Sequence, residues 1–258
     1  MRTIAIVNLK GGVGKTVTAI NFAAILAGDH QKRALLVDAD SQCNATEFFG
    51  ADSTIAGNLA ELLGGYASAT WCIHSTRYKG LSILPASDRL MDLDLSAIKS
   101  KTVNAAALRT MAADLTGEDL YDYMIIDCPP AFNAASTAAL LAADEVIIPI
   151  KLDAFSLRGM ANLLRQVRNM REINPGLRVA GCLKTMWYHD ATISEAEAQL
   201  STLGLPIFGT RIRRTPKVDG MTFAQEPLHL YSPGSSAGID YRRFVREYLE
   251  GGAGHGES

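Results

Sequence analysis

A glycine-rich stretch near the amino terminus, Lys10-Gly11-Gly12-Val13-Gly14-Lys15-Thr16, carries the residue types that bind phosphate. Its three glycines allow tight turns that aim backbone N–H groups inward, and the positive end of a following helix adds to them. Lys15 would reach the terminal phosphates, and the hydroxyl of Thr16 would bind Mg²⁺. The stretch therefore predicts a cradle for a nucleoside triphosphate. The residues assigned to it are Gly11, Gly12, Val13, Gly14, Lys15, Thr16 and Val17.

The flanking sequence predicts the elements that position this cradle. Residues 2–8 are an apolar run rich in β-branched residues, and residues 17–26 have apolar residues at helical spacing. A strand, a glycine loop and a helix in this order form a phosphate-binding loop. The common G-x-x-x-x-G-K-[ST] spacing fails at its first position, where Leu9 stands, and an extra lysine, Lys10, precedes the first glycine.

Carboxylates follow two further predicted strands. Asp38 and Asp40 follow the predicted strand 33–37, which is apolar after its first residue, and Asp127 ends the apolar run 123–126. Because parallel sheets place their ligands at the carboxyl ends of strands, these acids are expected beside the cradle. Asp127 would suit a water-mediated contact to Mg²⁺. For Asp38 and Asp40 the alternative is a capping role in the turn after the strand.

Strands and helices alternate along the rest of the sequence. Further strands are predicted at 80–86, 145–150 and 177–186, and helices at 55–63, 87–95, 103–115, 136–143, 156–171 and 194–203. This alternation predicts a single α/β P-loop domain over residues 1–250, with a mostly parallel twisted sheet and helices on both faces. The glycine-rich residues 251–258 are predicted to form a flexible tail.

The composition is that of a globular protein, with 48% hydrophobic and 20% charged residues among 258 and a net charge of −2. No apolar run is long enough to span a membrane, and no signal peptide is evident, so we expect a cytoplasmic protein. The four cysteines lie far apart without a C-x-x-C pair, which argues against a zinc site or cluster and favours reduced thiols.

Lys10 gives the loop the form K-G-G-V-G-K-T, which resembles the deviant Walker A motif of the ParA/MinD-type ATPases, most closely the short (Soj-like) ParA chromosome and plasmid partition proteins. In that family the extra lysine crosses a dimer interface to the nucleotide of the other subunit. The resemblance therefore implies ATP and Mg²⁺ as ligands, a homodimer formed on ATP binding, and a charge-stabilising role for Lys10 beside Lys15.

Two later segments extend the resemblance. Residues 38–46 are similar to the family's D-x-D-P-Q-x-N-x-T switch, in which Asp40 matches the acid that acts on the attacking water and Asp38 the acid that supports the magnesium region. Ser41 replaces the family's proline, which we expect to loosen the turn without removing the chemistry. Asp127, followed by Cys-Pro-Pro, is similar to the Walker B acid and is assigned to the metal with Thr16 and Asp38.

The carboxyl-terminal third resembles the closing pattern of the family. In relatives the loop at residues 215–218 lies against the adenine and residues 184–186 flank the base, so Met186, Thr215 and Pro216 are assigned to nucleotide binding. Basic residues there predict a local surface for non-specific DNA, with a solvated helix face as the alternative. The DNA-binding candidates are Arg211, Arg213, Arg214, Lys217, Arg242, Arg243 and Arg246.

The resemblance implies a partition ATPase with slow intrinsic turnover, which a ParB-like centromere-binding protein stimulates and which associates with the nucleoid when ATP is bound. A MinD-like positioning ATPase is an alternative, although the glycine-rich carboxyl end lacks the basic amphipathic helix of that subgroup. The nitrogenase-reductase branch is disfavoured, because it needs cysteines within glycine-rich segments to bind its cluster, and this sequence has no such segments. The third hypothesis is a regulatory DNA-binding scaffold that uses nucleotide only as a structural ligand.

Overall fold

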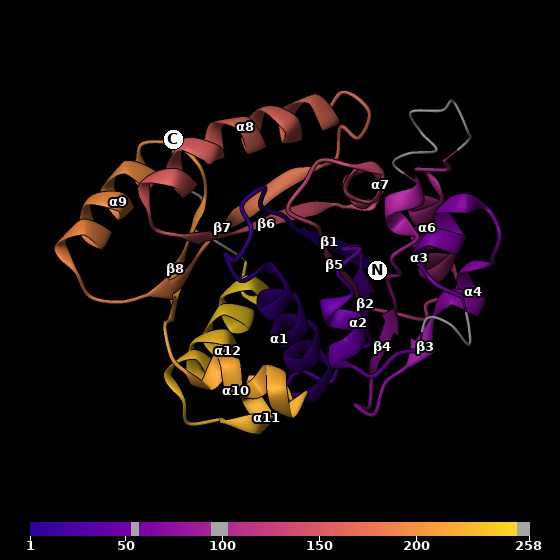
Figure 1. Ribbon diagram of the computed structural model, residues 1–258, viewed down its shortest axis with the longest axis horizontal. Helices are drawn as coiled ribbons and strands as arrows, with labels where there is room; N and C mark the ends of the chain where they lie inside the picture. Colours follow the sequence, from indigo (N-terminus) through magenta and orange to yellow (C-terminus); the bar gives the residue numbers. More distant parts are fainter. Residues whose placement is uncertain (53–56, 94–102, 252–258) are drawn as a thin grey trace.

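The computed structural model describes residues 1–52, 57–93 and 103–251. Its strands form one eight-stranded sheet in the order β3-β4-β2-β5-β1-β6-β7-β8 (Figure 1). Neighbouring strands are parallel except for the short edge pair β3 and β4. The strands are β1 (Arg2–Ile6), β2 (Ala34–Asp38), β3 (His74–Ser75), β4 (Leu81–Leu84), β5 (Tyr123–Asp127), β6 (Glu145–Lys151), β7 (Arg178–Trp187) and β8 (Ile207–Arg213). This is the predicted α/β fold class.

Helices cover both faces of the sheet, because alternate residues of the central strands point to opposite sides. In β1, Ile4 and Ile6 belong to one buried cluster and Ala5 to the other. On the first face lie α1 (Lys15–Gly28), α2 (Asn44–Phe48), α10 (Lys217–Ala224), α11 (Leu228–Tyr231) and α12 (Ser236–Leu249) (Figure 1). On the second lie α3 (Leu59–Gly64), α4 (Ala69–Cys72), α6 (Ala107–Gly117), α7 (Ala134–Ala142), α8 (Ala154–Met170) and α9 (Ala191–Ser201).

Polar caps explain why three helices begin earlier than their apolar periodicity predicts. The side chains of Asn133, Asp153 and Asp190 accept hydrogen bonds from backbone N–H groups in the first turns of α7, α8 and α9. Such caps satisfy donors that have no partner inside the helix. The apolar stripe then begins one or two residues inside each helix, so periodicity alone places the start too late.

Other differences from the predicted elements lie where local sequence is a poor guide. The segment after Thr215, expected as a loop, becomes helical from Lys217 onward, and the two-residue strand β3 and the single-turn helices α4 and α11 were not predicted. Of the helix predicted at 87–95, residues 90–93 are helical, whereas residues 87–89 are not and form the turn that leads into it. Residues 94–95 lie outside the described residues, as do residues 55–56 and the tail beyond Gly251.

Aromatic packing fixes α12 against α1 and β8. Phe244 lies between Phe22 of α1 and Phe208 of β8, with ring centroids 5.3 and 5.0 Å away. Tyr248 adds an edge contact to Phe22 at 5.0 Å. These large, buried rings hold the closing helix beside the helix that follows the glycine loop. The first and last quarters of the chain therefore pack together beside the glycine loop.

Candidate nucleotide-binding site

The glycine loop folds as a cradle at the carboxyl end of β1. Gly12 and Gly14 have φ angles of 71° and 86°, a left-handed conformation that residues other than glycine rarely adopt. Gly14 caps α1 without a side-chain partner, and no acid stands in the first turn of that helix. The free N–H groups and the helix dipole therefore favour an anion at this position. The hydroxyl of Thr185 on β7 donates to the carbonyl of Val13 at 2.7 Å and fixes the loop from the side.

Lys15 lies inside this cradle with only 7% of its surface exposed. Its ammonium group donates to the carbonyl of Lys10 at 3.1 Å. Burial lowers the pKa of Lys15, and the carboxylates of Asp127 and Asp40 oppose that shift. A buried cation between the loop and two acids is suited to neutralise an incoming phosphate group.

The side chain of Lys10 has a different set of partners from that of Lys15. Its ammonium group contacts both carboxylate oxygens of Asp153, at 2.7 and 2.6 Å, and the hydroxyl of Ser156 at 3.1 Å. The backbone N–H of Lys10 donates to the side chain of Asn8 at 3.0 Å, and Asn8 itself donates to the carbonyl of Pro149 at 2.8 Å. The entry of the loop is thus held against β6 and the start of α8.

The predicted acids converge beside the cradle. Asp38 and Asp127 end the neighbouring strands β2 and β5 and lie directly opposite each other in register. Asp38 accepts hydrogen bonds from the N–H and the hydroxyl of Thr46, both at 2.8 Å, and from the N–H of Asp40 at 3.1 Å. Burial raises the pKa of Asp38 to about 6, against the hydrogen bonds from Thr46. Burial and the nearby Asp38 carboxylate also raise the pKa of Asp127.

The environment of Asp127 fits a bound cation. Its two carboxylate oxygens are buried and accept no hydrogen bond from the residues that the structure describes. No group of three or more acidic, histidine or cysteine side chains in the same residues has the geometry of a complete metal site. Mg²⁺ needs no such cage, since it commonly binds one or two protein ligands together with waters and phosphate oxygens. Asp127 with the hydroxyl of Thr16 matches that donor set.

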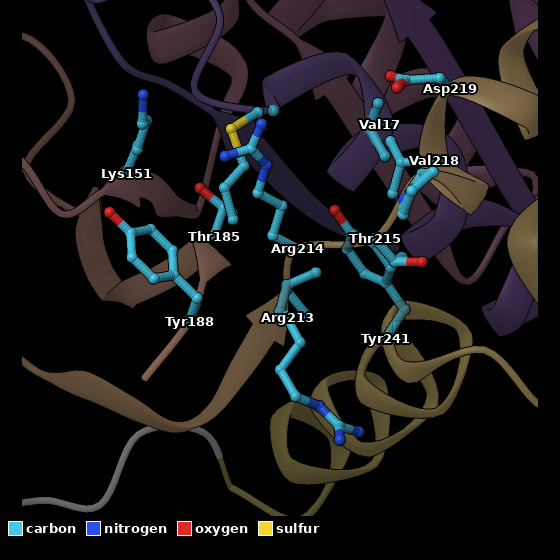
Figure 2. Close-up of a pocket in the computed structure, with 14 residues that line it drawn as sticks. Val17, Lys151, Thr185, Tyr188, Arg213, Arg214, Thr215, Val218, Asp219 and Tyr241 are labelled. Atoms are coloured by element: carbon cyan, nitrogen blue, oxygen red, sulfur yellow. The ribbon is translucent and has the colours of Figure 1, made fainter. Parts of the chain in front are cut away.

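A pocket of about 340 Å³ continues from the cradle between β7 and α10 (Figure 2). Gly14 of the glycine loop and Val17 of α1 line the pocket near the cradle, and the predicted residues Met186, Thr215 and Pro216 also line it. Figure 2 shows Val17, Val218, Thr215 and Tyr241 grouped on one side and Lys151 with Tyr188 on the other. A concave, partly apolar space of this size that opens onto a phosphate cradle is suited to a nucleoside.

The sequence did not reveal several residues of this site. Tyr241 is buried and lines the pocket, and its hydroxyl lies 3.1 Å from that of Thr18 on α1. The other lining residues that the sequence did not indicate are Lys151, Tyr188, Ile212 and Asp219. Thr185 and Val218 lie within the segments 184–186 and 215–218 that the resemblance placed near the base, and both line the pocket. For Asp219 the only signal was its position directly after the second of these segments. Tyr241 has no local signal, since it reaches the pocket only when α12 packs on α1.

Ion pairs divide the basic residues predicted to bind DNA. Arg213 makes a two-pronged contact with the buried carboxylate of Asp240 at 2.8 Å, and in Figure 2 it extends away from the other pocket residues. Arg242 pairs with Asp29 at 2.7 Å, and Arg211 pairs with Glu197 at 3.2 Å. The exposed candidates that form no ion pair with an acid among the described residues are Arg214, Lys217, Arg243 and Arg246.

Arg211 belongs to a cluster at the outer edge of the sheet. Glu197 of α9 also pairs with the buried ammonium group of Lys184 at 3.2 Å, and the guanidinium of Arg211 lies 4.7 Å from the ring centroid of Trp187. A cation that stacks on an aromatic face while paired with a carboxylate is held in place by both contacts. Arg211 therefore has a structural role in joining β7, β8 and α9.

Comparison with known proteins places this architecture in a family. Residues 1–179 match a family model described as an AAA domain. The chain is 32% identical over 257 residues to the chromosome partitioning protein ParA of Caulobacter vibrioides, covering 96% of this chain and 94% of that protein. This chain belongs to the ParA family of P-loop ATPases. The resemblance drawn from Lys10, Asp38, Asp40 and Asp127 is confirmed at the level of the family.

A second ParA protein agrees with this assignment, and a solved structure of another name shares the fold. The chromosome partitioning protein ParA of Myxococcus xanthus is 32% identical over 256 residues, covering 96% of this chain and 88% of that protein. A crystal structure named cobyrinic acid a,c-diamide synthase from Mycobacterium smegmatis, with a bound ATP analogue and magnesium, superposes with a TM-score of 0.84 at 28% identity, covering 97% of this chain and 94% of that one. No described helix of this ParA-family chain is long and apolar enough to cross a bilayer.

Proposed function

We propose that this ParA-family chain is a partition ATPase that binds ATP with Mg²⁺, forms a homodimer around the bound nucleotide and then holds DNA without sequence preference. A ParB-like protein stimulates slow hydrolysis, which returns the chain to a monomer. The observation that carries this proposal is the convergence of Lys15, Asp40 and Asp127 at one edge of the sheet, beside a glycine cradle. The ligands bound in the M. smegmatis structure support the nucleotide and metal assignment.

Each residue has a definite task in this proposal. The loop N–H groups and Lys15 would bind and orient the phosphates, while Thr16 and Asp127 would hold Mg²⁺, which would supply positive charge to offset that of the phosphates. Asp40 orients the attacking water, and its own segment is held by hydrogen bonds from the N–H of Gln42 to Asp40 and from the N–H of Asp40 to Asp38, both at 3.1 Å. Lys10 acts on the nucleotide of the second subunit.

Turnover measurements on two variants test the enzymatic part. Lys15→Ala should abolish ATP binding and hydrolysis, because the cradle then lacks its buried cation. Asp40→Ala should bind ATP and accumulate as a dimer with hydrolysis reduced at least about a hundredfold, the range in which positioned acid–base groups act. Size-exclusion chromatography with light scattering separates monomer from dimer, and phosphate release measures turnover. Rapid hydrolysis by Asp40→Ala would refute its assigned role.

Gel-shift and vesicle assays separate the alternatives. The proposal expects DNA retention with ATP but little with ADP or no nucleotide, because a dimer joins two weak basic surfaces. Equal retention in all three conditions removes the ATP dependence. A MinD-like activity would instead give ATP-dependent sedimentation with vesicles of anionic phospholipid, and a regulatory scaffold would bind ATP without turnover.

A further inference from the structure

Gln225 joins three elements that are far apart in sequence. It ends α10, and its backbone is left-handed, with φ of 51° and ψ of 38°. Its side-chain amide donates a hydrogen bond to the carbonyl of Glu47 in α2 at 2.8 Å. Its own carbonyl accepts hydrogen bonds from the guanidinium of Arg77 and, at 3.4 Å, from the hydroxyl of Tyr78 in the β3–β4 connection.

Contacts with residues of the β3–β4 connection stabilise the left-handed conformation of Gln225. A residue with a side chain adopts positive φ only at an energetic cost, so its surroundings must fix that conformation. Arg77 and Tyr78 bond to each other at 2.9 Å while both contact the carbonyl of Gln225, and the ring of Tyr78 packs edge-on against Phe49 with centroids 5.9 Å apart. These contacts direct the amide of Gln225 onto α2.

On one side of Gln225, α10 is part of the base pocket. Val218 and Asp219 in its first turn line the pocket. The helix is also tied to the glycine-loop helix through Asn21, whose amide donates to the carbonyl of Val17 at 2.8 Å and contacts the sulfur of Met221 at 3.4 Å. A base that enters the pocket therefore presses on a helix that ends at Gln225.

On the other side, α2 continues directly from the segment that carries Asp40. The N–H of Glu47 donates to the carbonyl of Cys43 at 2.8 Å, and the N–H of Cys43 donates to that of Asp40 at 2.9 Å. Thr46 holds the same helix to Asp38. With only five residues, α2 has little stability of its own and depends on such tertiary contacts.

We propose that Gln225 is a positioning residue that couples occupancy of the base pocket to the order of α2 and, through α2, to the position of Asp40. The inference rests on the proposed nucleotide site and adds a route by which the base, remote from the terminal phosphate, influences hydrolysis. Binding that orders one end of this route lowers the entropic cost of ordering the other end.

Hydrogen–deuterium exchange with MgADP tests the coupling without requiring hydrolysis. ADP lacks the terminal phosphate that would lie near Asp40, and the share of the protection of residues 44–50 that passes through Gln225 is measured by substituting that residue. In the unaltered chain MgADP should slow exchange in residues 10–17 and in residues 44–50. Gln225→Glu keeps the length of the side chain but removes the donor, and should accelerate exchange in residues 44–50 roughly fivefold, as expected for one lost hydrogen bond.

Gln31 provides a matched control. It is an exposed glutamine with a φ of 53°, so Gln31→Glu makes the same chemical change on the same backbone conformation away from α2. The proposal expects Gln225→Glu to lose the MgADP protection of residues 44–50 while residues 10–17 keep theirs, and Gln31→Glu to retain both. If Gln225→Glu retains full protection of α2, the coupling is refuted. If MgADP protects neither region in the unaltered chain, the nucleotide site itself is refuted.

Steady-state kinetics provide a second readout. A positioning role predicts that Gln225→Glu lowers kcat about three- to tenfold with KM for ATP changed less than twofold, since the pocket and the cradle are intact. A double-mutant cycle that combines Gln225→Glu with Asp219→Ala then measures the coupling between the base pocket and α2. The effect of Asp219→Ala on kcat should be smaller in the Gln225→Glu background, where the hydrogen bond to α2 is lost. If the effects of the two substitutions on kcat are additive, Gln225 does not couple the pocket to α2, and the proposal is contradicted.

Discussion

Lys10 forms its ion pair with Asp153 of the same chain, with its ammonium group 2.6 Å from the nearer carboxylate oxygen. Asp153 is also the cap of α8, where it accepts a hydrogen bond from the N–H of Ser156 at 2.8 Å. Burial of Asp153 is outweighed by the hydrogen bonds from Lys10 and Ser156, which lower its pKa to about 2. The lysine that the resemblance assigns to the partner's nucleotide is therefore occupied within its own subunit.

Asp153→Asn should make the ATP-dependent dimer easier to form. Asparagine keeps the helix cap but loses the charge that holds Lys10, and a partly exposed pair of this kind contributes up to about 1 kcal/mol, or about fivefold in an equilibrium constant. We expect half-maximal dimerisation at an ATP concentration several-fold lower, measured by light scattering. Asp190→Asn, at the cap of α9, is the matched control and should leave dimerisation unchanged. A weaker dimer in Asp153→Asn would contradict this prediction.

Arginines without an acidic partner among the described residues should respond differently to substitution from those that form ion pairs. Replacing Arg243 and Arg246 together by alanine should weaken ATP-dependent DNA binding and reduce the salt slope by about 2 per subunit, roughly one per lost phosphate contact. Their effect on the free energy of unfolding should be within about 0.5 kcal/mol. Fluorescence anisotropy at several salt concentrations and urea denaturation provide the two measurements.

Arg213→Ala should destabilise the fold by about 2 kcal/mol, because it leaves the buried carboxylate of Asp240 without its main partner. Its effect on DNA binding should be small once the fraction of folded protein is taken into account. A stable Arg213→Ala variant that no longer binds DNA would instead place this arginine at the nucleic-acid surface.

Cys43→Gly should stabilise the chain by about 1 kcal/mol. Cys43 has a φ of 55° at the start of α2, a conformation that glycine adopts without steric strain. Burial, together with nearby carboxylates such as Asp38, raises the pKa of the Cys43 thiol to about 11, so the thiol stays protonated at neutral pH. Urea denaturation measures the gain, and Cys43→Ala, which keeps the backbone constraint, should show none. An equal gain in both variants would assign the effect to the thiol.

His229 should make the unfolding free energy depend on pH. It is buried beside Gly28, its Nδ1 has no hydrogen-bond partner among the described residues, and burial lowers its pKa, with Asp29 opposing the shift and Arg242 adding to it. Below the unfolded value of about 6.5, the unfolded chain binds a proton at His229 that the folded chain rejects, so the contribution of His229 to stability falls as pH decreases. His229→Gln should flatten this slope between pH 7 and 5, whereas His30→Gln should leave it intact.

The sequence predicted the central elements well, because their signals are local. The strands that end in Asp38 and Asp127 are apolar runs closed by an acid, and parallel pairing brings such ends to one edge of the sheet. The cradle follows from its glycines and lysines. These features require no knowledge of which helix packs where, and the family resemblance depended on the same residues.

The sequence did not predict contacts that depend on long-range packing. Tyr241 and Gln225 have ordinary surroundings in sequence, and each acquires its role only when the last quarter of the chain folds over α1 and α2. Ion pairing is equally invisible beforehand, so Arg213 looked like a surface cation, whereas Asp240 from α12 neutralises it. Pair partners separated by tens or hundreds of residues leave no periodic signal.

Asp38 and Asp127 lie opposite each other on neighbouring strands, and this arrangement affects how long the protein survives in a cell. Two buried acids without a bound cation weaken the empty fold, and a ligand that binds only the folded chain adds about 2.7 kcal/mol of stability at a hundred times its Kd. Proteases degrade chains through their open states, so unloaded molecules are removed first. The abundance of this protein would then follow the supply of its nucleotide.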